Sequence, residues 1–204
     1  MQKDNSTFID KLKIRRKALS WLDAPPVILE THGGSGRLYK QLYSEFEGGV
    51  VFEKDQAKAE YLSRQRTTWA VYQSDTVSGL AAGAASWKPF NFIDCDPYGE
   101  PWHVISAFIA GRREFEPRLV IVVNDGLRQK IQLGGAWMVR SLEEAVKKFG
   151  NDLYGNYLEI ARWLMQSKVA PAGYTVSHFE GKYVGHNKGM THYAAILSRK
   201  GATS

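Results

Sequence analysis

The sequence contains almost no cysteine: Cys95 is the only one among 204 residues. A single thiol cannot form an internal disulfide, and it cannot supply a cysteine cluster for structural zinc. A chain without disulfides fits a reducing compartment, so we expect a cytoplasmic location and a buried, unreactive thiol.

Long apolar runs are also missing. No stretch approaches the roughly 20 apolar residues needed to cross a bilayer. The first 23 residues carry scattered charges and lack an apolar segment followed by a small-residue cleavage site. These absences predict no membrane partner and no secretion signal. Repeats and Pro/Ser-rich linkers are absent too, so we expect residues 1–204 to form a single domain.

Basic residues, by contrast, are in excess. The formal net charge is +6 and the pI about 9.3, in a composition that is 44% apolar and 12% aromatic and therefore globular. The excess favours an anionic partner such as nucleic acid, because basic side chains near aromatic rings suit phosphate contact and base stacking. The basic clusters are residues 11–17, 63–66, 111–113 and 126–130, and the tryptophans between them are Trp21, Trp69, Trp87, Trp102 and Trp137. Each cluster alone also fits an ordinary solvated helix face.

Short β-branched runs alternate with helical patterns along the first two thirds of the chain. The expected strands are residues 27–30, 49–53, 69–74, 90–94 and 119–124, and the expected helices are residues 7–22, 36–45, 55–64, 101–110 and 153–168. This alternation predicts a doubly wound α/β fold with a mostly parallel sheet. Residues 1–25 are expected to form a basic N-terminal helix ending at two prolines, with Lys11, Lys13, Arg15, Arg16 and Lys17 outside its apolar face.

The pattern changes near the C-terminus. Residues 174–184 and 192–199 are two strand-like runs with a short connection, so residues 172–200 are expected to form an antiparallel β hairpin. Residues 126–141 are the least regular part of the chain. They follow the fifth strand, which places them at the carboxyl edge of the sheet, where open α/β folds bind ligands.

A glycine-rich turn follows the first expected strand. In ETHGGSG, residues 30–36, the glycines permit a tight turn with close backbone approach, and the next helix presents its N-terminus to a ligand. Such a turn alone is equally compatible with a plain loop. Glu53 ends the next strand about 20 residues later, where a carboxylate can bind both hydroxyls of a ribose. Asp75 ends the third strand, where it can meet the amino group of an adenine. Either residue alone could be a solvated strand end, but together they favour an adenosine pocket.

In these motifs the sequence resembles the class I, Rossmann-like S-adenosylmethionine-dependent methyltransferases. In that family an acidic residue precedes a glycine turn around the methionine part of the cofactor, which Glu30, Gly34 and Gly36 match. Acidic residues after the next strands bind the ribose and adenine, which Glu53 and Asp75 match. The resemblance therefore implies S-adenosyl-L-methionine as the cofactor.

The resemblance also implies the whole architecture. The family has a seven-stranded sheet that ends in an antiparallel hairpin, a feature that separates it from dehydrogenases. His32 stands where the commonest form of the turn has its first glycine, so the local backbone path is expected to differ beside the cofactor.

The fourth strand leads into DCDPYGEP, residues 94–101. Asp96, Pro97 and Tyr98 resemble the Asp-Pro-aromatic motif of methyltransferases that act on amino groups of bases. An exocyclic amine is a poor nucleophile, so acceptors that orient its hydrogens help, and an aromatic ring can stack on a flipped base. The resemblance implies that Asp96 and the Pro97 carbonyl accept the two hydrogens and that Tyr98 stacks. Asp94 is expected to contact the cofactor or to hold the turn. A simple Asp-Pro turn closing the strand would explain the same residues.

These motifs lead to a hypothesis with alternatives. The sequence predicts methylation of an exocyclic base amine in RNA, or in DNA, and the Asp-Pro-aromatic-Gly order is loosely similar to tRNA guanine-N2 dimethyltransferases. A small-molecule or protein methyltransferase, or an inactive nucleic-acid-binding module, remains an alternative. No separate target-recognition domain is visible, so a partner subunit could supply recognition. His178, His186 and His192 have no spacing that suggests a shared metal.

Overall fold

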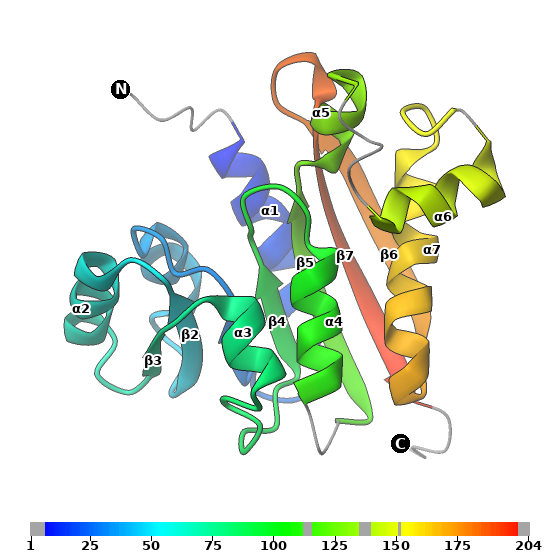
Figure 1. The fold of residues 1–204 in the computed structure, drawn as a ribbon. Helices are drawn as coiled ribbons and strands as arrows, with labels where there is room; N and C mark the ends of the chain where they lie inside the picture. Colours follow the sequence, from blue (N-terminus) through cyan, green and yellow to red (C-terminus); the bar gives the residue numbers. More distant parts are fainter. Residues whose placement is uncertain (1–6, 112–115, 135–139, 151, 200–204) are drawn as a thin grey trace.

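The computed structural model describes residues 7–111, 116–134, 140–150 and 152–199. They form three layers, in which one central sheet has helices on each face (Figure 1). The sheet has seven strands in the order β3-β2-β1-β4-β5-β7-β6. The strands are β1 (Ile28–Glu30), β2 (Gly49–Glu53), β3 (Ala70–Gln73), β4 (Phe92–Cys95), β5 (Arg118–Asp125), β6 (Tyr174–Val184) and β7 (Met190–Arg199). The first five are parallel, whereas β7 runs antiparallel to both β5 and β6. The predicted doubly wound sheet with a terminal hairpin is confirmed.

Helices connect the strands and cover both faces of the sheet. The α-helices are α1 (Phe8–Leu19), α2 (Gln56–Gln65), α3 (Thr76–Ala81), α4 (Trp102–Gly111), α5 (Leu127–Gln132), α6 (Arg140–Phe149) and α7 (Tyr157–Val169). The described residues also include three short helices: η1 (Tyr39–Tyr43), η3 (Ala170–Ala172) and η4 (His186–Lys188). None of the helices in the described ranges is long and apolar enough to cross a membrane.

Successive side chains of the central strands point to opposite faces of the sheet, and so pack into two separate apolar cores. On β5, Val120 and Val122 enter the core beneath α1, whereas Ile121 and Val123 enter the core beneath α4 and α7. In Figure 1, α3, α4 and α7 cover the face toward the viewer and α1 lies behind the sheet. Because both faces are covered, the central strands read as continuous apolar runs, as buried parallel strands do.

Three helical segments differ from the sequence prediction. Residues 39–43 form a π-helix inside the helix expected over 36–45. Residues 126–141 were expected to be irregular, but α5 and the first residues of α6 lie there, while 135–139 fall outside the described residues. The short helix α3 was not predicted. Asp75 is its N-cap and accepts a hydrogen bond from the Ser78 backbone at 3.0 Å, a capping signal present in the sequence.

Candidate active site

The carboxyl ends of the parallel strands meet at one edge of the sheet, the upper edge in Figure 1. Glu30 ends β1, Glu53 ends β2, and Asp94 and Asp96 lie at the end of β4. The Thr31 backbone N–H donates to the Asp94 carbonyl at 2.9 Å, which fastens the glycine turn to the β4 end. The structure therefore brings the two predicted halves of the site, the turn and the Asp-Pro segment, to adjacent strands.

The glycine turn has the conformation that the sequence predicts. Gly34 and Gly36 adopt left-handed φ angles of +54° and +71°, which favour glycine. A Cβ on Gly33 would lie 2.4 Å from the Leu62 side chain, so the backbone there packs too closely for any larger residue. Around Gly34, by contrast, no atom lies within 4 Å of the Cβ position. The turn thus offers open, side-chain-free backbone on its outer side, which fits a ligand that must approach the main chain closely.

His32 is tied into this turn. Its Nδ1 lies 2.8 Å from the Thr31 hydroxyl, within hydrogen-bonding distance. Burial lowers the pKa of His32, and nearby carboxylates only partly oppose that effect, so the ring is neutral at neutral pH. The residue that replaces the usual glycine therefore places an uncharged ring beside the turn.

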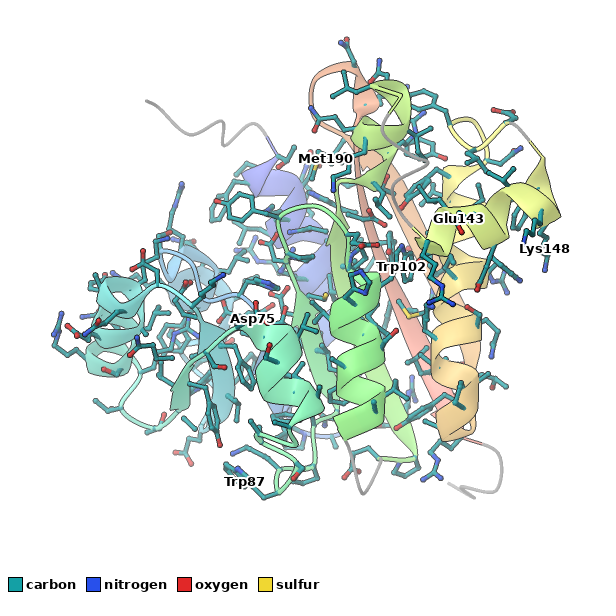
Figure 2. All side chains as sticks on the ribbon, viewed as in Figure 1. Asp75, Trp87, Trp102, Glu143, Lys148 and Met190 are labelled. Carbon is teal, nitrogen blue, oxygen red and sulfur yellow. The ribbon has the colours of Figure 1, made fainter. Side chains whose placement is uncertain are left out.

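Glu53 and Asp75 lie at the predicted edge of the sheet, but each accepts hydrogen bonds from nearby backbone N–H groups of the chain itself. Glu53 accepts hydrogen bonds from the backbone N–H groups of Gly34 at 2.8 Å and Asp55 at 2.9 Å, which joins β2 to the glycine turn. Asp75 caps α3, and this cap is the leading cause of its lowered pKa. Figure 2 shows Asp75 at the start of α3. Their predicted contacts with ribose and adenine stay predictions.

Glu30 lies beneath the turn and is 1% exposed. Burial raises the pKa of Glu30 to about 7, although Arg66, which donates to Glu30 through Nη1, opposes the rise. The Arg66 guanidinium also stacks over Tyr39 and Trp69, 4.3 and 5.3 Å from the ring centres. Arg66 had been grouped with the surface cluster 63–66, and that assignment is wrong because the side chain is fully buried. In this conformation Glu30 supports the turn from below, and its direct contact with a cofactor stays a prediction.

A second buried ion pair holds the end of β4. Arg15 reaches down from α1 and donates to both carboxylate oxygens of Asp94, with Nε at 2.7 Å from Oδ2. The Tyr43 hydroxyl donates to the same Oδ2 at 2.7 Å. Both members of the pair are 0% exposed. Arg15 had been placed outside the apolar face of its helix, and the structure corrects this: its pKa is raised because Asp94 outweighs the cost of burial.

Asp96 lies nearer the surface than Asp94, and its side chain is 18% exposed. Lys11 Nζ donates to both of its oxygens, at 2.9 and 2.8 Å. Although burial opposes ionisation, Lys11 and Arg15 hold the pKa of Asp96 below its usual range. The Pro97 carbonyl accepts no hydrogen bond from the described part of the chain, and Tyr98 is 95% exposed. The three predicted amine-binding groups are therefore at the surface of the edge, with Asp96 ionised.

Only some of the basic side chains in the remaining clusters lie at the surface. Arg128 is buried, stacks between Tyr154 and Tyr183 at 3.5 and 3.8 Å from the ring centres, and donates to the Lys188 carbonyl. It joins α5 to the hairpin and cannot contact phosphate. Arg112 and Arg113 lie outside the described residues. The exposed basic residues of these clusters are Lys13, Arg16, Lys17, Arg64 and Lys130.

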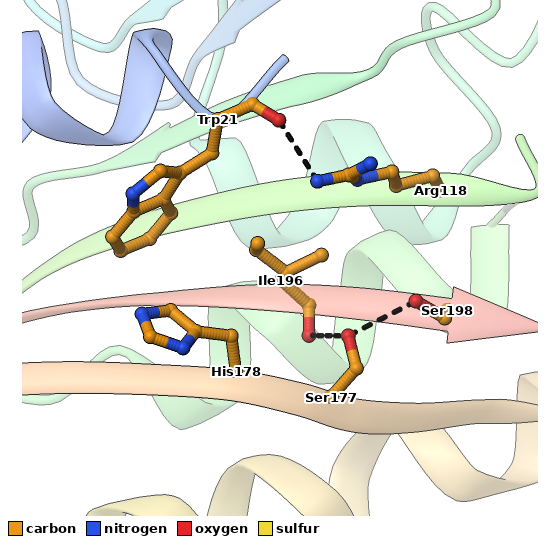
Figure 3. A pocket seen from close by; sticks show the side chains of 6 residues that line it. All are labelled: Trp21, Arg118, Ser177, His178, Ile196 and Ser198. Atoms are coloured by element: carbon orange, nitrogen blue, oxygen red, sulfur yellow. Dashed lines mark hydrogen bonds between the residues drawn. The ribbon is translucent and has the colours of Figure 1, made fainter. Parts of the chain in front are cut away.

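The tryptophans do not gather at the site. Trp69 and Trp102 are buried, and Trp87, which is 63% exposed, lies beyond the end of α3 that is opposite Asp75 (Figure 2). Trp137 lies outside the described residues. Trp21 borders an open groove of about 500 Å³ with His178 and Arg118 (Figure 3). Because Arg118 begins β5, this groove lies away from the carboxyl edge and is not part of the candidate site.

His192 was missed as a site residue. It lies on β7 opposite Asn124 of β5, is 0% exposed, and neither ring nitrogen has a hydrogen-bond partner. Burial, with the nearby cations of Arg15 and Lys11, lowers its pKa to about 3, so the ring is neutral. Among the described residues no group of three or more histidine, cysteine or acidic side chains could hold a metal ion. His192 is therefore an unpartnered neutral donor and acceptor.

This burial predicts acid sensitivity. Below pH 6.5 the unfolded chain takes up a proton on His192, whereas the folded protein keeps this ring neutral. His192 should therefore lower the free energy of unfolding by about 1.4 kcal/mol for each unit by which the pH falls. His192→Phe should flatten the decline between pH 6 and 5, measured by urea unfolding. His103→Gln is the matched control because the His103 side chain is 69% exposed, and it should leave the slope unchanged. Identical slopes in native protein and His192→Phe would contradict the prediction.

Comparison with known proteins gives a structural likeness without a close sequence match. No protein-family model matches the chain, and no curated protein matches it significantly. Among solved structures, the M. jannaschii TYW2 in complex with AdoMet aligns with a TM-score of 0.59 at 14% identity, over 98% of this chain and 78% of that one. The putative methyltransferase yhhF from Escherichia coli aligns with a TM-score of 0.56 at 17% identity, over 92% and 84%. The plantazolicin methyltransferase BpumL in complex with SAH aligns with a TM-score of 0.58 at 11% identity, over 97% and 86%. The chain thus has the Rossmann-like fold of the class I S-adenosylmethionine-dependent methyltransferases.

Proposed function

We propose that the protein is an S-adenosylmethionine-dependent methyltransferase that acts on an exocyclic amine of a base in RNA, or in DNA. The observation that carries the proposal is the adjacency of two features at one sheet edge. An open glycine turn lies at the end of β1, and the partly buried, ionised Asp96 lies with Pro97 and Tyr98 at the end of β4, the strand beside it. This is the arrangement that a methyl donor and an amine acceptor need in order to meet.

The residues around the turn fit the cofactor. The backbone of Gly34 and Gly36 would lie against its amino acid part, Glu53 would hold the ribose, and Asp75 would face the adenine. Glu30 and Asp94, both buried, would fix the turn and the β4 end through their arginine partners. When bound, S-adenosylmethionine supplies an activated methyl group on a sulfonium. Its known presence in the M. jannaschii TYW2 structure, and SAH in BpumL, support this assignment for the present chain.

The chain itself would position and polarise the amine. Asp96 accepts one hydrogen of the amine through its carboxylate, and the free Pro97 carbonyl accepts the other. Together they hold the nitrogen lone pair toward the methyl donor and stabilise the positive charge that develops during transfer. Tyr98 is 95% exposed, so its ring can lie flat on a base. Alignment and electrostatics are the contributions this site offers.

Cofactor binding is the first test. Isothermal titration with S-adenosylmethionine should show one site per chain. Gly34→Val should weaken binding at least tenfold, because a β-branched side chain disfavours φ +54° and would fill the open side of the turn. The matched control is Gly134→Val, which also has positive φ and open space but lies after α5, away from the turn. No heat of binding at millimolar cofactor would refute the proposal.

The substrate class can be tested separately. Transfer of a radiolabelled methyl group to total RNA, genomic DNA and nucleic-acid-free extract distinguishes a base methyltransferase from one that acts on a small molecule or protein. We expect labelling of RNA that declines steeply with salt, since phosphate contacts release counterions. Labelling of extract alone would favour the other substrate classes, and absence of all transfer despite cofactor binding would favour an inactive binding module. A partner subunit and a cytoplasmic setting complete the proposal.

A further inference from the structure

A row of polar side chains crosses the sheet beneath the first two turns of α1. Asp96 follows the last paired residue of β4, Asn124 lies on the neighbouring β5, and His192 faces Asn124 from β7. Their side chains point to the α1 face, as do Val122 and Ala194 one layer deeper in the core. The row is continuous with the predicted amine-binding residue.

Two members of this row carry buried side-chain nitrogens without a hydrogen bond of normal geometry, although the Asn124 oxygen accepts from Arg15 at 3.3 Å. The Nδ2 atom of Asn124 has no hydrogen bond of normal geometry, although the amide lies close enough to help lower the pKa of Asp96. Both ring nitrogens of His192 are unpaired as well. Buried polar atoms are almost always satisfied, so unpaired atoms on adjacent strands indicate a ligand that the folded chain lacks.

Lys11 covers the row in this structure. Its ammonium donates to both oxygens of Asp96 and so occupies the carboxylate that would accept a hydrogen from a substrate amine. On the other side of the helix, Asp10 accepts a hydrogen bond from Lys182 of β6, the residue paired with His192. Both contacts join side chains that are 18% to 42% exposed, so they lie within reach of solvent and of a ligand that enters from it. The first turns of α1 are thus fastened over the row by contacts that a ligand can displace, whereas Arg15 anchors the helix further down.

The row has a definite hydrogen-bonding pattern. Asp96 accepts, and Asn124 Nδ2, which is next to it, donates. A neutral His192 offers one donor and one acceptor. A planar ring complements this pattern when its amino group faces Asp96 and an unprotonated ring nitrogen beside the amino-bearing carbon faces Asn124. An alkylamine, such as a lysine side chain, has no acceptor at that position and would leave Asn124 unpaired.

We propose that Asp96, Asn124 and His192 form the floor of the substrate site, that Lys11 occupies the position of the substrate amine in this structure, and that the ring bound there carries its amino group next to an unprotonated ring nitrogen. This inference rests on the proposed function, since it names the substrate chemistry of the same site. It adds Asn124 as a specificity-determining residue and Lys11 as the group that substrate displaces.

The test uses binding, not turnover. Cytidine, whose amino group has one neighbouring ring nitrogen, is compared with the deazacytidine in which that nitrogen is replaced by CH, using titration of the full chain saturated with SAH. Lys11→Met removes the competing ammonium and should strengthen cytidine binding about tenfold, whereas Lys13→Met, an exposed position on the same helix, should not. Lys11→Met should also prefer cytidine to the deaza analogue about tenfold.

Asn124→Leu in the Lys11→Met background supplies the decisive comparison. It keeps the size of the side chain but removes the donor, so cytidine and its analogue should bind equally. Thermal unfolding confirms that the variant is folded, and His192→Phe should weaken both ligands alike. Equal binding of the two nucleosides to Lys11→Met, or no gain over Lys13→Met, would overturn the inference. If SAH does not bind, the proposed function fails. The same comparison of the two nucleosides, made without SAH, still tests whether Asp96, Asn124 and His192 form a binding site.

Discussion

Asp96→Ala should lower the rate of methyl transfer by about 10²–10³-fold, the usual cost of removing a group that stabilises charge developing in a transition state. Cofactor affinity should change little, because no described contact joins Asp96 to the glycine turn. Lys11, whose side chain is 23% exposed, can turn toward water once its partner is gone, so the variant should remain folded. Single-turnover transfer and isothermal titration measure the two quantities on one preparation.

Asp96→Asn is the matched control for this prediction. The amide oxygen can still accept a hydrogen from the amine, but the negative charge is lost, so we expect activity between those of the native protein and Asp96→Ala. Equal, undiminished transfer in both variants would remove Asp96 from the mechanism. A parallel loss of cofactor affinity would instead assign Asp96 to cofactor binding.

Arg15→Met should lower the free energy of unfolding by about 3–5 kcal/mol, because it leaves the Asp94 carboxylate buried without its cation. Asp94 would retain the Tyr43 hydroxyl, which cannot neutralise a charge. Arg15 also donates to the Asn124 side chain at 3.3 Å and to the Lys11 carbonyl at 3.2 Å, so the same change loosens α1 above the sheet. Urea unfolding at neutral pH gives the free energy.

Two further variants separate the lost pairing from lost packing. Arg16→Met changes the next, exposed residue of α1 and should shift stability by no more than about 0.5 kcal/mol. Adding Asp94→Asn to Arg15→Met removes the unpaired charge, so the double variant should be more stable than Arg15→Met alone. If the double variant is less stable than the single one, the destabilisation does not come from an unpaired carboxylate.

The strands and the glycine turn were predictable because local sequence decides them. Apolar β-branched runs such as residues 119–123 fit only a strand covered on both faces, and Gly34 and Gly36 stand where the chain needs left-handed φ angles. The acidic residues at the strand ends follow from the same pattern, since parallel strands bring their carboxyl ends to one edge. Those parts of the site needed no knowledge of distant contacts.

The partners of these acidic residues were not predictable in the same way. Arg15, Arg66 and Arg128 each lie in a basic run that resembles a solvated surface. Only the folded chain shows that they pair with Asp94, Glu30 and backbone carbonyls, respectively. One signal was present in α1. Leu12 and Ala18 are buried three positions either side of Arg15, so the arginine stands in the apolar stripe and not opposite it. A charged residue in an apolar stripe indicates a buried partner.

The burial of His192 could not be predicted from the sequence, for a different reason. Its burial depends on β7 entering the sheet between β5 and β6, and on α1 lying across that strand. Nothing within a few residues of His192 indicates either event. The catalytic candidates of the fourth strand are therefore visible in the sequence, whereas the proposed floor that extends from them is visible only in the fold.

The position of β7 also affects when the site can form. Lys11 and Asp96 are 85 positions apart in the sequence, and Asp10 and Lys182 are 172 positions apart. Contacts over such separations form late, because long loops must close before they contribute stability. During synthesis, residues 190–199 leave the ribosome after every other strand, and only then can β7 pair with β5. An incompletely synthesised chain therefore has a glycine turn but no finished substrate floor.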